Sequence, residues 1–388
     1  MIRLGLFLGV KPHAGGMFQY AQSLLDALAA LPPDRYGVEV ACASEDWRPI
    51  LATYPFPVTW LKHGELGLRM ADGLMALLVP GPLSRLLSRL FNPVVRQIMH
   101  RRQDFWIFPA QDGIAYQTPV PMVVAIHDLM HRYERRFPEV GGGYRFPIRE
   151  HRFRSLVRWA KGVLVDSEIG RRQVVDAYGV DTGKVYPLPY IPPREIYAAG
   201  AADLSQYDLP KKFLFYPAQF WAHKNHQALL EAGAALLPRC PDLQFAFTGG
   251  KRNLYDQLVA HAERLGMRDH VRFLGYVGAA ELPTLYRRAR ALVMPTFLGP
   301  TNIPPLEAMA CGCPVAVSGI YAMPEQLGDA ALYFDPLSTA AMAAVIEQLW
   351  RDDDLCRRLS QAGLQHVAAW GPAQFANRLQ EILDSLTA

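Results

Sequence analysis

The chain has 388 residues, and its content of 51% hydrophobic and 20% charged side chains excludes an intrinsically disordered protein. Its length suits two domains of roughly 150 to 200 residues each rather than one compact core. The net charge of +4 is uneven, because residues 1–195 carry 24 basic and 18 acidic side chains while residues 196–388 carry a net charge of −2, so the first half is predicted to meet an anionic partner.

Short apolar runs alternate with helical stretches along both halves of the chain. After Gly16, for example, apolar side chains recur at helical spacing. Strands that alternate with helices are typical of parallel sheets covered by helices on both faces, so the pattern predicts an α/β protein with two Rossmann-like domains. Strands are predicted at Ile2–Val10, Val38–Ala43, Phe105–Phe108, Met122–Ile126 and Val163–Asp166, and then at Phe213–Tyr216, Gln244–Thr248, Val271–Leu274, Ala291–Met294, Pro314–Ser318 and Ala331–Phe334.

A proline-rich and then small-residue stretch separates the two halves. It runs over Pro187–Pro193 and Ala198–Ala202, and this composition is typical of a linker. We expect an N-terminal domain at residues 1–195 and a C-terminal domain at residues 205–369, with a last helix at about 370–388 that packs back on the first domain. Since open α/β sheets bind ligands beyond the carboxyl ends of their strands, the expected site is a cleft across which the two domains face each other.

Residues 73–102 combine many leucines with five arginines and have no acidic side chain after Asp72. This composition resembles an amphipathic helix at a membrane interface, interrupted by three prolines. The alternative is an ordinary pair of helices that packs against the sheet. A second basic run, residues 132–161, has nine basic and three acidic side chains. It is either a solvated face or, where it follows a strand end, part of the site.

Two polar segments of the first half follow strand ends. Gly15 and Gly16 come after the first strand and open a helix, where the backbone can approach a phosphate and the helix N-terminus offers N–H donors. The alternative is that the glycines serve only the turn. His127 and Asp128 stand at the end of another strand, where polar side chains tend to face the crevice. The alternative is a satisfied structural histidine, with Asp128 as a local cap.

A turn near the start of the second half carries the strongest local signal. It places Gln219, Lys224, Asn225 and His226 between a strand and a helix. A lysine at such a turn can pair with a diphosphate as a mobile point charge. A lone surface lysine elsewhere would not indicate a site.

A loop at residues 295–302 leads from another strand into a helix. The backbone N–H groups of Thr301, Asn302 and Ile303 are predicted to be free, so they could bind an anion or a sugar. Glu307 is placed in the first helical turn, where a carboxylate is favoured for structural reasons alone. Its functional use would be to accept hydrogen bonds from two ribose hydroxyls.

Taken together, these segments resemble the large glycosyltransferase family four, whose members are retaining enzymes with the two-domain GT-B fold. The resemblance spans nearly the whole chain and is clearest over residues 213–336. His127-Asp128 also matches a weaker landmark in the first half. The motifs that follow in family order and spacing are Lys224-Asn225, Gly249-Gly250, Pro304–Gly312 and Pro324–Asp329.

The resemblance implies a role for each matching position. Gly15 and Gly16 would lie near the donor phosphates, and His127 would lie near the transferred sugar. Lys224 would bind the diphosphate, and Glu307 the nucleoside ribose. The groups expected to act in catalysis are His127, Lys224 and Asn302. The groups expected to bind the donor are Gly15, Gly16, Gln219, Lys224, Asn225, Gly250, Thr301, Asn302, Ile303 and Glu307.

Two positions depart from the family pattern. The family usually has two glutamates with seven residues between them, and here the first falls on Gly299. The family also often has an arginine five residues before the lysine, and that position is Gln219. One sugar-contacting carboxylate and one phosphate-binding cation are therefore absent. The surrounding motif is intact, which is typical of a family subgroup.

The resemblance also implies a mechanism without a metal or cofactor. The charge on the leaving diphosphate would be neutralised by Lys224 and by helix N-termini. Since Gly299 offers no carboxylate beside the anomeric carbon, we predict retention by a front-face mechanism without a covalent intermediate. In that mechanism His127 holds the sugar and does not serve as a base.

The sequence thus predicts a retaining hexosyltransferase, mannosyltransferase-like, that uses a GDP- or UDP-linked sugar. The acceptor would be a glycan or a lipid-linked saccharide in cell-envelope polysaccharide synthesis. One alternative is a nucleotide-sugar-binding partner subunit that has lost transfer activity, and another is a GT-B epimerase of nucleotide sugars. The basic first half predicts peripheral contact with an anionic membrane, and no nucleic acid partner is expected.

The five cysteines, an odd number, predict no disulfide framework and fit a reducing cytosol. No signal-peptide pattern precedes the first strand, and no apolar stretch has the length of a transmembrane helix. We therefore expect a cytoplasmic protein that is peripheral on the inner face of the plasma membrane.

Overall fold

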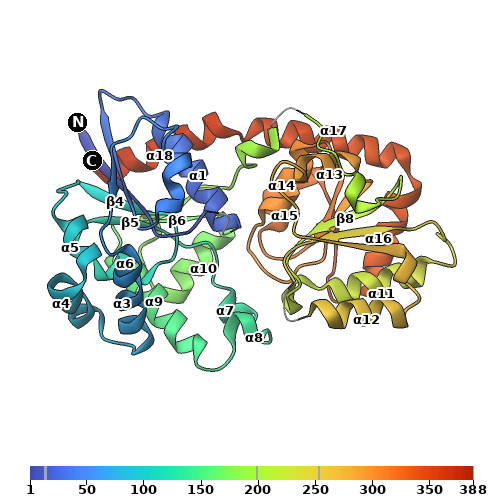
Figure 1. Cartoon of the computed structure of the whole chain (residues 1–388), viewed down its shortest axis with the longest axis horizontal. Helices are drawn as coiled ribbons and strands as arrows, with labels where there is room; N and C mark the ends of the chain where they lie inside the picture. The colour runs from blue at the N-terminus through green and yellow to red at the C-terminus, as the bar shows by residue number, and fades with distance from the viewer. Residues whose placement is uncertain (13–14, 198–199, 252–253, 388) are drawn as a thin grey trace. The chain divides into compact units, whose positions relative to one another are not determined.

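The structure is a computed structural model that describes residues 1–12, 15–197, 200–251 and 254–387. It divides into two compact units (Figure 1). Unit 1 comprises Met1–Tyr190 with Pro372–Ala388, and unit 2 comprises Ile191–Gly371. Each unit is built on its own parallel sheet, so the predicted α/β class with two Rossmann-like domains is confirmed.

Unit 1 holds a sheet of seven parallel strands. The middle strands are short, continuous apolar runs that are fully buried, because helices cover both faces of the sheet. The strands are β1 (Ile2–Leu8), β2 (Tyr36–Cys42), β3 (Val58–Trp60), β4 (Phe105–Phe108), β5 (Met122–Ala125), β6 (Gly162–Val165) and β7 (Val185–Pro187). They lie in the order β3-β2-β1-β4-β5-β6-β7.

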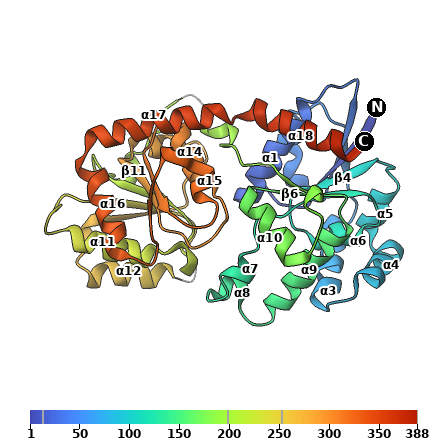
Figure 2. The same ribbon diagram turned by 180° about the vertical axis from the view of Figure 1, so that it is seen from behind.

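The helices of unit 1 include the last helix of the chain. They are α1 (Gly16–Ala29), α2 (Arg48–Leu51), α3 (Gly64–Ala76), α4 (Gly81–Phe91), α5 (Pro93–Met99), α6 (Gly113–Gln117), α7 (Met130–Tyr133), α8 (Pro138–Gly141), α9 (Arg145–Trp159), α10 (Glu168–Tyr178) and α18 (Pro372–Thr387). Figures 1 and 2 both show α18 beside α1, although the two are more than 300 residues apart in the chain. Phe375, Leu379 and Leu383 are fully buried in this contact, so α18 completes the core of unit 1.

Unit 2 holds a sheet of six parallel strands, in the order β10-β9-β8-β11-β12-β13. The strands are β8 (Leu214–Pro217), β9 (Phe245–Thr248), β10 (Val271–Gly275), β11 (Ala291–Met294), β12 (Val315–Ser318) and β13 (Leu332–Phe334). The helices are α11 (His226–Leu236), α12 (Tyr255–Arg264), α13 (Leu282–Arg288), α14 (Ile303–Ala310), α15 (Met323–Leu327), α16 (Thr339–Arg351) and α17 (Asp353–Ala369). Helices α11 and α12 lie on one side of the sheet, and α13, α14 and α17 on the other (Figure 1).

All eleven predicted strands are present, with ends that differ by at most two residues. Two further strands, β3 and β7, were not predicted. Both are three-residue edge strands, too short to form a recognisable apolar run. Strand β7 also ends in Pro187, the first residue of the predicted linker. A proline is tolerated on an edge strand because no ladder partner needs its missing N–H.

The boundary between the units falls between Tyr190 and Ile191, within the first part of the predicted linker. Ala198 and Ala199, in its second part, lie outside the described residues. Over the described part of the chain, no helix combines the length and the apolar character needed to cross a membrane.

Candidate functional site

The two central strands of unit 2 define where a ligand is expected. The strand order reverses between β8 and β11, which pair directly. Ligands of open α/β sheets bind at such a reversal, beyond the carboxyl ends of the strands. The segments that follow these strands are the turn at residues 218–225 and the loop at residues 295–302. Phe297 N donates to His223 O at 2.9 Å, so the turn and the loop contact each other.

Hydrogen bonds to Lys224 O and from the Asn225 side chain hold the main chain of the turn in place. The Tyr216 hydroxyl donates to Lys224 O at 3.0 Å. Asn225 follows in a left-handed conformation, with φ 59°, and its Nδ2 donates to Pro336 O at 3.0 Å. The Asn225 side chain therefore helps to position the turn, and its donor-binding role stays a prediction. At the start of the turn, the Trp221 indole donates to Gln219 Oε1 at 2.9 Å.

His226 begins α11 directly behind this turn and is 1% exposed. Its ring packs on Tyr216, Phe220 and Phe247, with centroid separations of 4.6, 4.9 and 5.4 Å. Burial, together with the nearby Lys224 charge, lowers the pKa of His226 to about 3. The ring is therefore neutral at physiological pH and adds no charge beside Lys224.

Gly249 follows β9 and brings its backbone against the turn. A Cβ at this position would lie 2.3 Å from Ala218 O, so only glycine permits the approach. Among the described residues, none has a heavy atom within 4 Å of the place where a Cβ of the neighbouring Gly250 would stand. The donor-binding role of Gly250 stays a prediction.

The loop after β11 departs from the sequence prediction at Asn302. The Asn302 N–H donates to Gln326 Oε1 at 2.9 Å, and Gln326 Nε2 donates back to Asn302 O at 2.9 Å. The Asn302 side chain donates to Leu298 O at 3.1 Å. The prediction of a free Asn302 amide is therefore wrong, because a side chain of α15 occupies it. Thr301 is 6% exposed and Ile303, 8% exposed, begins α14.

Gly299, in the same loop, has φ +93°. A Cβ there would lie 2.6 Å from Thr301 O and 2.9 Å from Asn302 Nδ2. Both the backbone conformation and the close contacts exclude an ordinary side chain. The glycine found where the family has a glutamate is therefore built into the shape of this loop.

Glu307 lies in the second turn of α14, because the helix begins at Ile303. The predicted position in the first turn is wrong, and a helix-start role no longer explains the carboxylate. Glu307 is 3% exposed, and its Oε2 accepts a 2.8 Å hydrogen bond from the Tyr286 hydroxyl. A buried carboxylate costs free energy unless it is hydrogen-bonded. Its presence just behind the loop is consistent with a binding role.

In unit 1, Gly15 and Gly16 form the N-terminus of α1. Gly15 has φ 68°, and no side chain caps the helix. Both glycines are exposed, and among the described residues nothing lies within 4 Å of a Cβ at Gly15. The phosphate contact predicted here would use the start of α1, where Phe18 N already donates to Gly15 O at 3.0 Å. His13 and Ala14, in the same segment, lie outside the described residues.

Both ring nitrogens of His127 are hydrogen-bonded to protein groups. Nε2 lies 2.8 Å from Pro109 O, and Nδ1 lies 2.8 Å from the Tyr190 hydroxyl. Because a carbonyl only accepts, Nε2 carries the proton and Nδ1 accepts from Tyr190. Burial lowers the pKa of His127, which favours this neutral form. His127 can bind a sugar hydroxyl only in exchange for one of these two partners.

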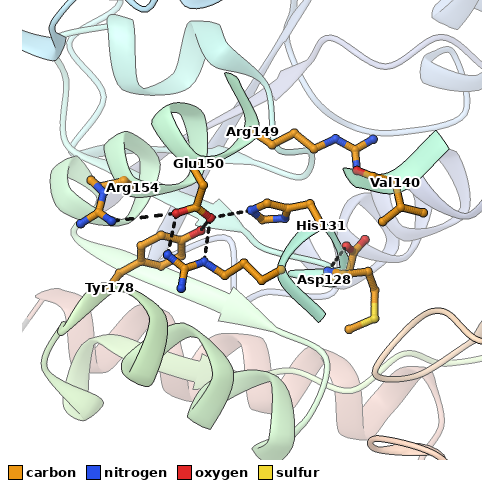
Figure 3. Close-up of polar contacts among 9 residues, drawn as sticks. Asp128, His131, Val140, Arg149, Glu150, Arg154 and Tyr178 are labelled. Atoms are coloured by element: carbon orange, nitrogen blue, oxygen red, sulfur yellow. Dashed lines mark hydrogen bonds and ion pairs between the residues drawn. The ribbon is translucent and has the colours of Figure 1, made fainter. Parts of the chain in front are cut away.

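Asp128 caps a short helix: its Oδ1 accepts from Met130 N at 2.9 Å. Beyond it, Glu150 of α9 joins the segment after β5 to the rest of unit 1 (Figure 3). The Glu150 carboxylate accepts from His131 Nε2 at 2.7 Å. It also accepts from Nε and Nη2 of Arg132, at 2.7 and 2.5 Å. Against the effect of burial, these bonds lower the pKa of Glu150. Part of the basic run 132–161 is thus neutralised internally.

A polar cluster at the centre of unit 1 was not predicted. The strand order reverses between β1 and β4, and Gln111 and Asp112 follow β4 at that reversal. A Cβ added to Gly9, which follows β1, would lie 2.9 Å from Asp112 Oδ2. Within the described part of the chain, the buried side-chain atoms without a hydrogen-bond partner include Gln111 Nε2, Asp112 Oδ2 and, from α9, Arg152 Nε. Burial raises the pKa of Asp112 to about 6, although the Arg152 charge opposes the shift.

Unpaired buried polar atoms are uncommon in folded proteins, so a cluster of them indicates a place for a polar ligand or water. No sequence motif indicated these residues, because Asp112 and Arg152 lie 40 positions apart in the chain and only the fold brings them near each other. Across the described residues, no group of three or more His, Cys, Asp or Glu side chains could hold a metal ion.

Residues 205–366 match the family model described as glycosyl transferases group 1. Among known proteins, O-antigen chain mannosyltransferase B of Escherichia coli is 29% identical over 296 residues. That match covers 69% of this chain and 74% of the relative.

Solved structures match over the whole chain. Sucrose-phosphate synthase from Thermosynechococcus elongatus has a TM-score of 0.73 at 17% identity, and the match covers 100% of this chain and 99% of that one. HepE from Anabaena, solved in complex with UDP-glucose, has a TM-score of 0.71 at 16% identity and covers 99% and 100% of the two chains. These likenesses show the fold, which is GT-B.

Proposed function

We propose that this chain, which belongs to the glycosyl transferases group 1 family through its residues 205–366, is an active enzyme that moves a hexose from a nucleoside-diphosphate sugar to a glycan or lipid-linked saccharide. The observation that carries the proposal is the pair of segments at the β8–β11 reversal. They bring Lys224 and the buried Glu307 to the same edge of one sheet. A cation for the diphosphate and a carboxylate for the ribose are the groups that such a donor needs.

The similarity to an O-antigen chain mannosyltransferase supports cell-envelope glycan synthesis and a mannosyltransferase-like activity. HepE, a fold relative, was solved with UDP-glucose, so both GDP- and UDP-linked hexoses are candidate donors. The enzyme would work at the inner face of an anionic membrane, where a lipid-linked acceptor is presented.

The family is retaining, and we propose a front-face route to retention. Gly299 has no carboxylate to attack the anomeric carbon, and Asp128 is engaged as a helix cap. The leaving diphosphate would therefore receive the acceptor proton, while Lys224 stabilises its developing charge. His127, neutral, would exchange its bond with Tyr190 or Pro109 for one with a sugar hydroxyl and so orient the sugar without acting as a base. No metal ion is needed in this scheme.

In unit 1, the cluster of Gln111, Asp112 and Arg152 is the proposed acceptor-binding group. Its unpaired donors and acceptor are the kind of groups that hydroxyl-rich saccharides satisfy. Gly15 and Gly16 remain the proposed phosphate contact of the same unit.

Replacing Asp112 by asparagine should weaken acceptor use. The ionised carboxylate accepts hydroxyl hydrogen bonds, so its loss should lower kcat/KM for the acceptor by roughly 10- to 100-fold. In the wild type, kcat/KM should fall as the pH drops through about 6, where Asp112 takes up a proton. Steady-state kinetics should show that this acidic limb is absent from the Asp112→Asn protein. Asp176→Asn, at an exposed position of the same unit, is the control and should keep the acidic limb of the wild type. If the Asp112→Asn protein also keeps this limb, Asp112 does not bind the acceptor.

Replacing Glu307 by glutamine should weaken nucleotide binding by roughly 10- to 100-fold, because a charged acceptor for two ribose hydroxyls is lost. Calorimetry should then show that a 2′,3′-dideoxy nucleotide binds the variant about as well as the normal nucleotide does. Glu263→Gln, on exposed α12, is the control. If the dideoxy change costs the same affinity in both proteins, Glu307 does not contact the ribose.

Donor turnover with and without acceptor tests the proposed function against its two alternatives. An active transferase releases nucleoside diphosphate faster when acceptor is present. An inactive partner subunit binds the donor and releases nothing, and an epimerase interconverts sugars without needing an acceptor. A prior thermal-shift screen of nucleoside diphosphates selects the donor, because ligand at 100 times its Kd stabilises a protein by about 2.7 kcal/mol.

A further inference from the structure

Helix α4 of unit 1 turns its two serines inward and three of its four leucines outward. Ser84 and Ser88 are 0% and 1% exposed. On the other side of the helix, Leu83, Leu86 and Leu90 are 46%, 52% and 52% exposed. A surface helix of a protein in water has the reverse arrangement, with its apolar stripe on the core.

Polar contacts, and not these leucines, hold α4 on unit 1. Ser88 Oγ donates to Gln117 Oε1 of α6 at 2.9 Å. The Arg85 guanidinium donates to Tyr116 O at 3.0 Å and lies 4.3 Å from the ring centroid of Trp159. These contacts hold α4 on unit 1 from its inward side, while about half of the surface of Leu83, Leu86 and Leu90 stays exposed.

Further large apolar side chains are exposed just before α4 and at its last residue. Leu77 and Leu78 precede the helix and are 77% and 41% exposed, and Phe91 at its end is 65% exposed. Leu78 has φ +52°, a left-handed conformation that is strained for a leucine. Single exposed leucines are normal, but six large apolar side chains on one helix and its ends mark an interaction site. The α4 surface is defined as Leu77, Leu78, Leu83, Leu86, Leu90 and Phe91.

The charged side chains of the segment that carries the α4 surface are all basic, and the nearest acidic residue before it in the chain is Asp72 of α3. Residues 73–102 contain no acidic side chain. Arg89 of α4, Arg96 of α5 and Arg102 are exposed, and none of them forms an ion pair within the described part of the chain. Figure 1 shows α3, α4 and α5 side by side at one end of unit 1. Apolar side chains beside unpaired arginines complement a lipid surface that carries negative headgroups.

We propose that the α4 surface docks on the interface of an anionic lipid bilayer, with its leucines among the upper acyl chains and the arginines at the headgroups. This inference deepens the peripheral membrane contact of the proposed function by naming the surface that makes it. A second copy of the chain fits less well, because pairing two α4 surfaces would bring arginines of like charge together.

Vesicle sedimentation of the full chain tests the proposal. The probes are vesicles of phosphatidylcholine alone and of phosphatidylcholine mixed with an equal amount of phosphatidylglycerol, each at low and high salt. The wild type should pellet with the mixed vesicles at low salt and much less at high salt. The variant Leu83→Gln/Leu86→Gln/Leu90→Gln should bind the mixed vesicles at least ~10-fold more weakly. Leu337→Gln/Leu364→Gln, on exposed leucines of unit 2, should bind like the wild type.

Charge is tested separately by Arg89→Gln/Arg96→Gln, which should weaken binding to the mixed vesicles and flatten its dependence on salt. Three results overturn the proposal: no binding of the wild type at low salt, equal binding to neutral and mixed vesicles, or equal binding of the triple glutamine variant and the wild type. A wild-type dimer that the triple variant abolishes, without vesicle binding, would assign the α4 surface to a second copy.

A fluorescent reporter places the contact on the helix itself. Phe91→Trp should show a blue shift of the added emission with the mixed vesicles, because the indole leaves water. An unshifted difference spectrum on bound protein would mean that another surface docks. Donor hydrolysis in solution should be the same in the triple variant and the wild type, so failure of the docking proposal is distinguishable from failure of the proposed activity.

Discussion

Replacing Lys224 by alanine should slow sugar transfer by roughly 30- to 1000-fold, a loss of about 2–4 kcal/mol of transition-state stabilisation. The reason is the accumulation of charge on the leaving diphosphate. Gln219 occupies the position where the resemblance to family four implies an arginine, so Lys224 would have no second cation at that position to share its task. Single-turnover kinetics at saturating donor measure the effect on the chemical step.

The Lys224→Ala protein should remain folded, because the main chain of the turn is held by Tyr216 and Asn225 rather than by the lysine side chain. Lys211→Ala, on an exposed lysine of the same unit, is the matched control and should keep full activity. Unchanged turnover of a folded Lys224→Ala protein would contradict the assignment of Lys224 to the leaving diphosphate.

Replacing Gly299 by glutamate, which restores the usual family residue, should lower the free energy of unfolding by about 2–4 kcal/mol and should not raise activity. The φ of +93° strains any side chain, and the new Cβ would collide with Thr301 O and the Asn302 amide. Shifting Asn302 would also break its reciprocal bonds with Gln326. Denaturant unfolding, monitored alongside transfer activity, measures both parts of the prediction.

The control for Gly299→Glu is Gly266→Glu. Gly266 also has a positive φ, +71°, but no atom lies within 4 Å of a Cβ there. Gly266→Glu should therefore cost only the conformational strain, about 1 kcal/mol. If Gly299→Glu is as stable as the wild type and turns over faster, the loop accepts a carboxylate. The glycine at this position would then no longer support a front-face mechanism.

The fold was largely predictable from the sequence because central parallel strands are buried on both faces and read as continuous apolar runs. Strands β4 and β11 were predicted at their observed ends for this reason. Edge strands carry a weaker pattern, so β3 and β7 were missed. In α4 the helical spacing of Leu83, Leu86 and Leu90 was visible, but spacing alone does not say which side of a helix faces the core.

The site was predictable only where a local motif carries it. Lys224 lies in the turn that follows β8, and Glu307 lies in the second turn of α14, which follows the loop after β11. The Asn302 amide could not be judged from its neighbours, since Gln326 lies 24 residues away and reaches it through the packing of α15. Asp112 and Arg152 were invisible to motif reasoning because their meeting depends on strand order.

Proton NMR of the wild-type enzyme with a nucleoside-diphosphate α-hexose tests the central claim most directly, because it reports both bond cleavage and stereochemistry. The sugar first transferred, to acceptor or to water, should carry the α configuration before mutarotation, and its release should be slowed in the Lys224→Ala protein. A β-configured first product, or no cleavage of any nucleotide sugar that the protein binds, would contradict the assignment of this chain as an active retaining glycosyltransferase.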